Sequence, residues 1–271
     1  PGSWMGGYKY SVDESRNLHG GAWATSLLFN VENVNGNVGV STWDKAEYNI
    51  DLSVKAYGNT ESEASENLKK VEASIDERTL QGRLELILTI SVPRLTWNRV
   101  NVNIVVTLPA DATISLDVET TNGGVSVKDL TGGTLVLKTT NGAIVFDGVD
   151  ATTIQASTTN GAIEGSVQAT DLTAGTTNGR ISVSLPCTRS GSYGLRTTNG
   201  NVDVTVEKTV EVGFDLDMST SVGSVNLSIS GLTYETNTTR HKIARTEGYD
   251  NKPVRISIEA STTNGSGSIH T

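Results

Sequence analysis

The sequence is poor in cysteine, proline, aromatic residues and long apolar runs. Its one cysteine, Cys187, cannot form a disulfide within the chain, which suits either a cytosolic protein or a surface protein that does without disulfides. No run of 18 apolar residues is present, so the sequence predicts no membrane-spanning helix. Because only 5% of the residues are aromatic, we expect a core of small aliphatic side chains.

A basic surface is also missing, since the formal net charge is −9. Such a charge repels phosphate backbones, so nucleic acid is excluded as a partner. No signal peptide is visible, and Pro1–Trp4, ahead of Met5, is interpreted as a cloning remnant that could have replaced a leader or anchor. We therefore favour the cell surface or the extracellular space and leave the cytoplasm open.

Repetition dominates what is present. The tetrapeptide Thr-Thr-Asn-Gly recurs at intervals of 18 to 21 residues, with its asparagine at Asn122, Asn141, Asn160, Asn178 and Asn199. A further copy contains Asn264, a divergent copy contains Asn35, and a degenerate copy has Val222 where asparagine would stand. An internal repeat of this length is typical of a solenoid, in which each unit adds one coil.

The residues around each turn alternate between apolar and polar side chains. Leu135 and Leu137 lie six and four residues before Asn141, while Ile144 and Phe146 follow it by three and five, and the other copies keep this pattern closely. Period-two alternation predicts strands with one buried face. The alternation changes phase across the tetrapeptide, so the chain turns a corner there, and Asn-Gly suits a corner because both residues tolerate positive φ.

Two architectures fit this pattern. Asn-Gly between alternating strands is also a hairpin signal, so an antiparallel meander is one alternative. A meander does not require identical residues at identical positions, whereas a parallel solenoid does, because equivalent residues stack about 4.8 Å apart. We therefore predict an all-β fold, a parallel β-solenoid or β-helix with rungs of about 19 residues.

Stacked corners predict a structural turn ladder. Asparagine side chains in such a column can hydrogen-bond as an amide ladder. We also expect the second threonines of the tetrapeptides, Thr121, Thr140, Thr159, Thr177 and Thr198, to pack and hydrogen-bond along the axis. The predicted ladder consists of Asn35, Asn122, Asn141, Asn160, Asn178, Asn199 and Asn264 with Gly123, Gly142, Gly161, Gly179 and Gly200.

The chain divides into an N-terminal segment, residues 1–28, and one solenoid domain, residues 29–271. Within the domain, residues 43–110 form an insertion or cap, 111–231 the regular rungs, and 232–271 an irregular excursion and the last rung. Strand-like runs at 48–56, 84–92 and 100–108 flank a helix that a capping box at Thr60–Glu63 opens and that extends to about Ala73, with Leu68, Val71 and Ile75 as its apolar stripe. A solenoid end needs covering, so a cap is favoured over a ligand-binding subdomain.

The segments VENVNGNVGVSTWD and VTLPADATISLDVETTNG, with the helical insertion and the run of TTNG units, carry a family resemblance. Together they resemble the putative adhesin family of prokaryotic β-strand repeat proteins, a domain of unknown function, over roughly residues 29–269. The resemblance implies a right-handed β-solenoid with a cell-surface or adhesive role. It implies no catalytic residue and no cofactor.

Residues able to carry chemistry are few. The histidines His19, His241 and His270 do not lie at metal-ligand spacing from cysteines or carboxylates, so no metal site is predicted, and His19 falls in a stretch expected to be mobile. A glycosidase needs two carboxyl groups about 5–10 Å apart, and the candidates are Asp147, Asp150, Asp203, Asp215 and Asp217. No column of the repeat is consistently acidic, so solvated surface positions explain them better. Cys187 is interpreted as an inert side chain.

The tryptophans Trp4, Trp23, Trp43 and Trp97 could stack on sugars, although Trp43 could instead cap the core. The leading hypothesis is a non-enzymatic cell-surface or structural solenoid, an adhesin that presents a Thr/Ser/Asn-rich face to a glycan, a protein or a sister subunit. The alternatives are an intracellular self-assembling scaffold module and a carbohydrate-active β-helix enzyme.

Overall fold

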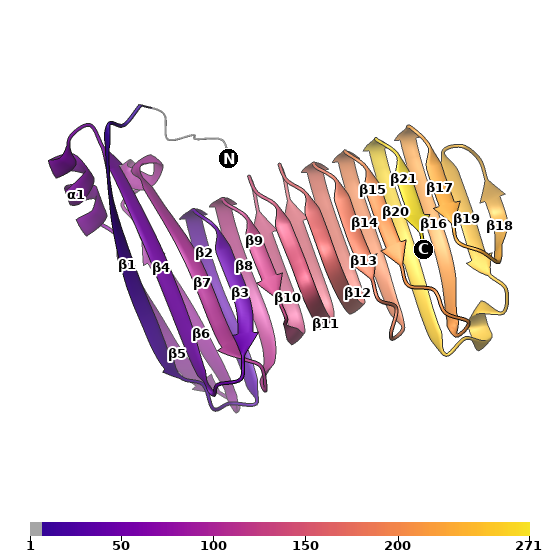
Figure 1. The fold of residues 1–271 in the computed structure, drawn as a ribbon, viewed down its shortest axis with the longest axis horizontal. Helices are drawn as coiled ribbons and strands as arrows, with labels where there is room; N and C mark the ends of the chain where they lie inside the picture. The colour runs from indigo at the N-terminus through magenta and orange to yellow at the C-terminus, as the bar shows by residue number, and fades with distance from the viewer. Residues whose placement is uncertain (1–6) are drawn as a thin grey trace.

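The computed structural model describes residues 7–271, and the cloning remnant predicted at Pro1–Trp4 lies outside the described residues. Strands stack side by side along one long axis, from β1 and α1 at one end to β18 at the other (Figure 1). The strands join into one sheet that coils around the core. Its two walls, called the first and second sheet below, are connected at the Asn-Gly corners and through the continuous strands β11 and β12. The fold is therefore all-β and solenoid-like.

Neighbouring strands are parallel throughout the central stack. In spatial order the first sheet contains β6 (Arg83–Ser91), β2 (Ser26–Asn35), β8 (Thr113–Asn122), β10 (Thr131–Thr139), the second halves of β11 (Ile144–Thr158) and β12 (Ile163–Asn178), then β14 (Gly191–Asn199), β20 (Val254–Asn264) and β16 (Val212–Val222). The second sheet contains β7 (Val100–Pro109), β3 (Val38–Trp43), β9 (Val125–Lys128), the first halves of β11 and β12, then β13 (Ile181–Leu185), β15 (Val202–Val206), β21 (Gly267–His270) and β17 (Val225–Ser228). Parallel pairing rules out the antiparallel meander for the repeats.

The register places equivalent residues of successive repeats beside each other. Leu135 pairs with Ile154, Leu137 with Ala156 and Thr139 with Thr158, and all of these side chains face inward and are buried. The core is built mainly of valine, leucine and isoleucine, and the three phenylalanines of the chain are all buried in it. Alternation of buried and exposed residues along each strand thus converts the sequence repeat into continuous apolar columns.

Antiparallel strands extend both ends of this stack. At the N-terminal end, β4 (Glu47–Gly58) pairs with β7, β1 (Tyr10–Gly21) pairs with β4, and β5 (Glu72–Leu80) pairs with β6. The helix α1 (Glu61–Lys69) packs against β4 and β1, and a 3-10 helix, η1 (Arg94–Arg99), precedes β7. At the C-terminal end, β19 (His241–Thr246) pairs with β16, β18 (Leu232–Asn237) pairs with β19, and η2 (Tyr249–Asn251) precedes β20.

Two expectations about the N-terminal end were wrong. Residue His19, expected in a mobile stretch, lies in β1, because β1 aligns with β4 along its whole length and satisfies its backbone groups there. The helix begins as predicted, with the Thr60 side chain accepting a hydrogen bond from the Glu63 N–H, but it ends at Lys69. Ile75 lies in β5 opposite Leu88, because this segment pairs with the otherwise open edge of β6.

The last repeat in the chain is not the last in space. Strands β20 and β21, which carry the Asn264 corner, lie between β14–β15 and β16–β17 (Figure 1). The degenerate corner at Val222 therefore stands at the end of the column. Gly267 occupies a core position that valine or isoleucine fills in the other repeats, and a Cβ built there would lie 2.4 Å from Met218 Cε. Met218 thus fills the space that Gly267 leaves.

Candidate functional site

The asparagines of the repeat form one hydrogen-bonded column along an edge of the stack. Asn122 Nδ2 donates to Asn35 Oδ1 at 2.7 Å, and each later amide donates to its neighbour in the same direction at 2.8–2.9 Å. The column runs in the order Asn35, Asn122, Asn141, Asn160, Asn178, Asn199 and Asn264. It begins where Asn35 Nδ2 donates to the carbonyl groups of Trp97 and Val100, and it ends beside Val222.

The glycines that follow these asparagines lie unusually close to one another. A Cβ built on Gly142 would lie 2.0 Å from the Gly123 carbonyl oxygen, and one on Gly161 would lie 1.8 Å from that of Gly142. Gly123, Gly179 and Gly200 show the same approach at 1.8–2.0 Å. Our expectation that positive φ requires these glycines is wrong for Gly142, which lies outside the left-handed region. Close contact between adjacent backbones is the reason that no side chain fits.

The first threonine of each tetrapeptide is buried and connects one corner to the next. Thr139 Oγ1 donates to the Gly123 carbonyl at 2.7 Å and Thr158 Oγ1 to the Gly142 carbonyl at 2.9 Å. The same bond recurs from Thr120, Thr176, Thr197, Thr262 and Thr220. The prediction chose the wrong threonines, because residues such as Thr121 and Thr140 point outward at the phase change and are exposed.

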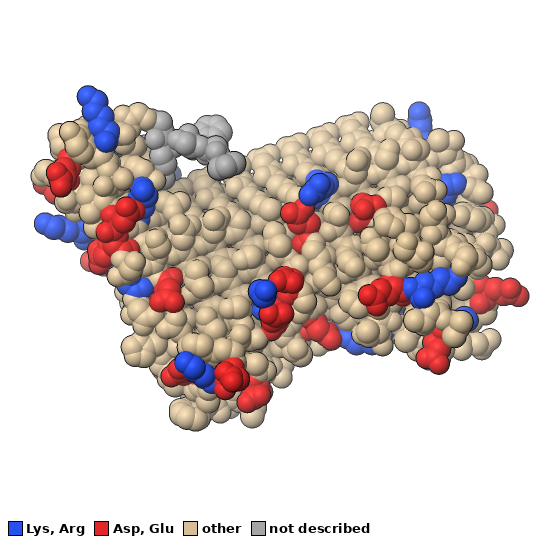
Figure 2. Space-filling view, viewed as in Figure 1, with Lys and Arg blue, Asp and Glu red and all other residues tan. Residues whose placement is uncertain are grey.

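Exposed threonines and asparagines therefore stand in two adjacent columns along this edge. The outer threonines are Thr121, Thr140, Thr159, Thr177, Thr198 and Thr263. Strand stacking fixes their spacing at about 4.8 Å, and the buried contacts beneath hold them in place. Figure 2 shows wide uncharged areas on the molecule between separate clusters of charged side chains. The result is an ordered polar surface without charge of its own.

A cleft of about 430 Å³ lies at the N-terminal end of the asparagine column. It forms because β6 stops pairing with β2 at Glu32 and Thr89, whereas β2 continues beside β8 as far as Asn35. Beyond that point the chain leaves the sheet through Val92 into η1. The open side of β2 then binds β7 through side chains, since the buried Asn33 Nδ2 donates to the Val102 carbonyl at 2.8 Å.

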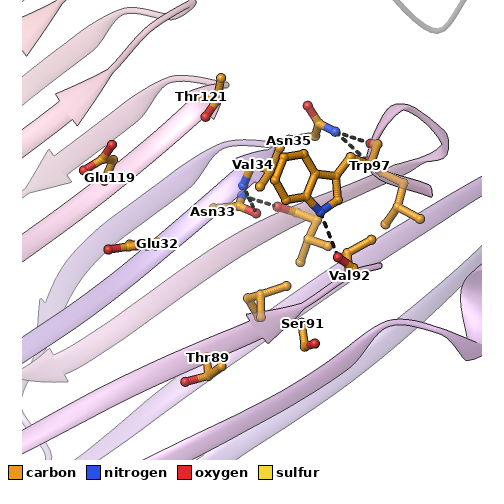
Figure 3. A pocket seen from close by; sticks show the side chains of 13 residues that line it. Glu32, Asn33, Val34, Asn35, Thr89, Ser91, Val92, Trp97, Glu119 and Thr121 are labelled. Atoms are coloured by element: carbon orange, nitrogen blue, oxygen red, sulfur yellow. Dashed lines mark hydrogen bonds between the residues drawn. The ribbon is translucent and has the colours of Figure 1, made fainter. Parts of the chain in front are cut away.

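The walls of the cleft differ in chemistry. Trp97 forms one side, with its indole N–H donating to the Val92 carbonyl at 2.7 Å, and Glu32, Glu119 and Thr121 lie on the other side (Figure 3). Glu32 and Glu119 are neighbours in register on β2 and β8. Neither carboxylate forms a hydrogen bond or an ion pair with another residue in the described part of the chain. This site combines an aromatic wall with free acceptors.

Sequence reasoning listed Trp97 among aromatics able to stack on a sugar but missed the cleft. A signal for the two carboxylates was present, because Glu32 and Glu119 both stand three residues before a repeat asparagine, where later copies have Lys138 or Ser157. The chain leaves the sheet near Pro93, but the sequence does not show that this point lies beside Glu32 and Glu119, because that depends on the pairing of β6 with β2. Of the other tryptophans, Trp4 lies outside the described residues, Trp23 is 84% exposed, and Trp43 is half-buried with its N–H on the Glu47 carbonyl.

The candidate catalytic carboxylates are occupied by basic partners. Asp147 pairs with Lys128 at 3.0 Å, Asp150 with Arg189, and Asp215 with Arg245 at 2.5 Å. Asp217 and Asp203 face His241 and His270 at 2.9 and 3.3 Å. His19 Nδ1 lies 2.9 Å from Asn17 Oδ1.

Within residues 7–271 no group of three or more histidine, cysteine or acidic residues is placed to hold a metal ion. Cys187 is buried, and desolvation raises the pKa of its thiol to about 12. Its thiolate is therefore scarce at neutral pH. The described helices include none with the length and apolar character needed to cross a bilayer.

Residues 29–265 match the family described as Toastrack DUF4097. No curated protein matches the chain. Among solved structures, it is similar to a putative cell adhesion protein from Clostridium sporogenes, with 12% identity, 95% of this chain and 99% of the other covered, and a TM-score of 0.46. It is also similar to a putative adhesin from Bacteroides fragilis, with 10% identity, coverage of 94% and 97%, and a TM-score of 0.41. Likeness at this level does not transfer a ligand or a role from one chain to another.

Proposed function

The chain belongs to the DUF4097 Toastrack family, and from this premise we propose that it is a non-enzymatic, adhesin-like recognition protein of the cell surface. Its binding face is the edge that carries the exposed threonine and asparagine columns. The ligand is a glycan or a protein at another surface. The twelve predicted ladder residues act as the support that keeps this face in register.

The single observation that carries this proposal is the bonding beneath the outer threonines. Each inner threonine bonds to the carbonyl of the neighbouring glycine, and each asparagine bonds to the next, so the outer hydroxyl groups are held at a fixed spacing. A surface whose polar groups are already ordered loses little conformational entropy when it binds. Such a face suits recognition of an extended, hydroxyl-bearing or amide-bearing partner.

The finer features of the fold belong to the same proposal. Right-handed winding is supported by the general handedness of crossovers between parallel strands. A rung of about 19 residues is supported by the register, which pairs Ile144 with Ile163 and Leu135 with Ile154. The helix α1 and the antiparallel strands β1, β4 and β5 are proposed as the cap. Of the range 43–110 predicted for it, β6 and β7 instead pair in parallel with β2 and β3 of the stack.

The two ends of the stack favour display over self-assembly. End-to-end polymerisation requires open strand edges, and the N-terminal edges bear charged side chains, with Asp76, Glu77 and Arg78 on β5. At the other end, the bulge between Tyr234 and Thr236 makes the pairing of β18 irregular. Charges and bulges on edge strands oppose the addition of further strands. The ion pairs at Asp147, Asp150 and Asp215 likewise give no support to hydrolysis.

Interferometry tests the proposal by measuring how tightly the purified protein binds to arrayed glycans and matrix proteins. Thr140→Lys combined with Thr159→Lys places two bulky charges at the centre of the face, and we expect at least a tenfold loss of binding. Ser126→Lys, at an exposed position of β9 in the other sheet, is the matched control and should bind like the wild type. Absence of any bound partner, or an equal loss in the control, would refute the assignment of this face.

A further inference from the structure

We propose that the cleft between β2, β6, β8 and η1 binds a neutral sugar ring, stacked on Trp97 and held by Glu32 and Glu119. This inference rests on the proposed recognition function and names one ligand class for it. It concerns the end of the asparagine column and not the threonine face along its length. The contacts that carry it are those of the cleft walls.

Trp97 provides a fixed aromatic surface. Its side chain is 39% exposed, its indole N–H is bound to the Val92 carbonyl, and its own carbonyl accepts the Asn35 amide at the start of the column. The first of these bonds holds the ring and the second holds the backbone of Trp97, while part of the residue remains exposed to solvent. An aromatic ring with an apolar body suits the C–H face of a pyranose.

The opposite wall supplies acceptors for hydroxyl groups. Glu32 and Glu119 stand on adjacent strands about 4.8 Å apart, and each ionised carboxylate can accept two or more hydrogen bonds. Neither is used by another residue in the part of the chain that the structure describes. Thr89 and Thr121 flank them and can either donate or accept. Neighbouring hydroxyl groups of a sugar are the donors that such a wall lacks.

The charge and size of the cleft narrow the ligand further. Among the described residues that line it there is no lysine, arginine or histidine, so two carboxylates would repel a uronic acid or a phosphate. The Arg94 guanidinium lies 5.8 Å from the centre of the Trp97 ring but outside this lining. Lys138, next in the row on β10, lies outside the lining. A volume of about 430 Å³ exceeds what a small ammonium ion needs and falls in the range of ordinary ligand pockets. These features together favour a neutral ring over an anion or a simple cation.

The test is an NMR titration of the whole protein that follows the Trp97 indole N–H. The probes are methyl glucoside, methyl galactoside, methyl mannoside, glucuronate and choline. We expect at least one glycoside to shift the Trp97 signal, with glucuronate binding at least tenfold more weakly. Both Trp97 variants lack the indole signal, so their binding is followed through the backbone amide signals of Val34 and Asn35, which also line the cleft. Trp97→Ala should weaken binding of that glycoside about threefold to tenfold, as removal of a stacking ring does. Trp97→Phe should retain most of the affinity and so controls for folding, and Glu119→Gln should weaken binding.

Two matched controls separate this site from the rest of the surface. Trp23→Ala removes an exposed tryptophan elsewhere, and Glu247→Gln removes an exposed carboxylate outside the cleft; both should bind like the wild type. The inference is overturned if no glycoside moves the Trp97 signal, if glucuronate binds as tightly, or if choline binds while the glycosides do not. If glycosides bind at the cleft but the Thr140 and Thr159 test fails, the threonine face is refuted as the binding surface and the proposal for the cleft stands.

Discussion

Replacing Gly142 with alanine tests how the corners stack. The added Cβ would lie 2.0 Å from the Gly123 carbonyl oxygen, whereas ordinary contacts of this kind exceed 3 Å. Neither backbone can move away alone, because Thr139 bonds to Gly123 and Thr158 bonds to Gly142. The two corners must therefore separate by more than an ångström.

The expected cost follows from these contacts. Overpacking of this kind costs about 1–3 kcal/mol. Each of the two threonine hydrogen bonds adds about 0.5–1.5 kcal/mol if it is lost. We expect Gly142→Ala to destabilise the protein by about 2–6 kcal/mol.

Urea unfolding followed by circular dichroism measures this loss, since the midpoint should fall by about 1–2 M at an unchanged slope. Gly175→Ala in β12 is the matched control, because the nearest atom to its Cβ would be the Arg196 carbonyl oxygen at 3.9 Å. That substitution should be neutral or stabilise by up to about 1 kcal/mol. Equal midpoints for the two variants would refute close stacking of the glycines.

Thr158→Val keeps the shape of the side chain but leaves the Gly142 carbonyl without its hydroxyl donor, so the free energy of unfolding should fall by about 1–3 kcal/mol. The control is Thr159→Val at the exposed neighbour, which should change it by less than about 0.5 kcal/mol. Val222→Asn places an amide beside Asn264 and should raise the free energy of unfolding by about 0.5–1.5 kcal/mol, which appears as a higher urea midpoint. A lowered midpoint would contradict a column that ends there. The raised pKa of Cys187, about 12 against an ordinary 9.0, predicts negligible alkylation of the native protein at pH 8. Because the folded state keeps this thiol neutral, its contribution to stability is complete below pH 9 and is lost between pH 9 and 12, as pH-dependent urea midpoints would show.

The repeat could be predicted from the sequence because one physical pattern governs every rung. Alternation around Asn141 already specified which residues face the core, and identical corners indicated parallel stacking. The spatial position of the Asn264 corner could not be predicted, because a copy with the same local pattern fits any place along the stack. The one sequence signal was Gly267, a glycine where the other repeats have valine or isoleucine, which indicates that a larger side chain fills the space beside it. That side chain, Met218, is distant in sequence.

The candidate site shows the same limit. Trp97 could be identified as an aromatic residue able to stack on a sugar. Glu32 and Glu119 are acidic where later repeats are not, but their position within the repeat is an ordinary outward one. They become significant only because β6 leaves the sheet beside them, which depends on pairing between distant segments. The inner and outer threonines, such as Thr158 and Thr159, were exchanged for a local reason, since the phase change at the corner decides which one points inward.

The central claim is that corners stack in register, with the Asn264 repeat inserted between those of Asn199 and Val222. Paired cysteines test it directly. Thr198 and Thr263 lie on adjacent rungs, about 4.8 Å apart, while Thr198 and Ser221 lie two rungs apart. We predict that cysteines at Thr198 and Thr263 form a disulfide under mild oxidation and that cysteines at Thr198 and Ser221 do not. The opposite result would show that the repeats stack in the order of the chain.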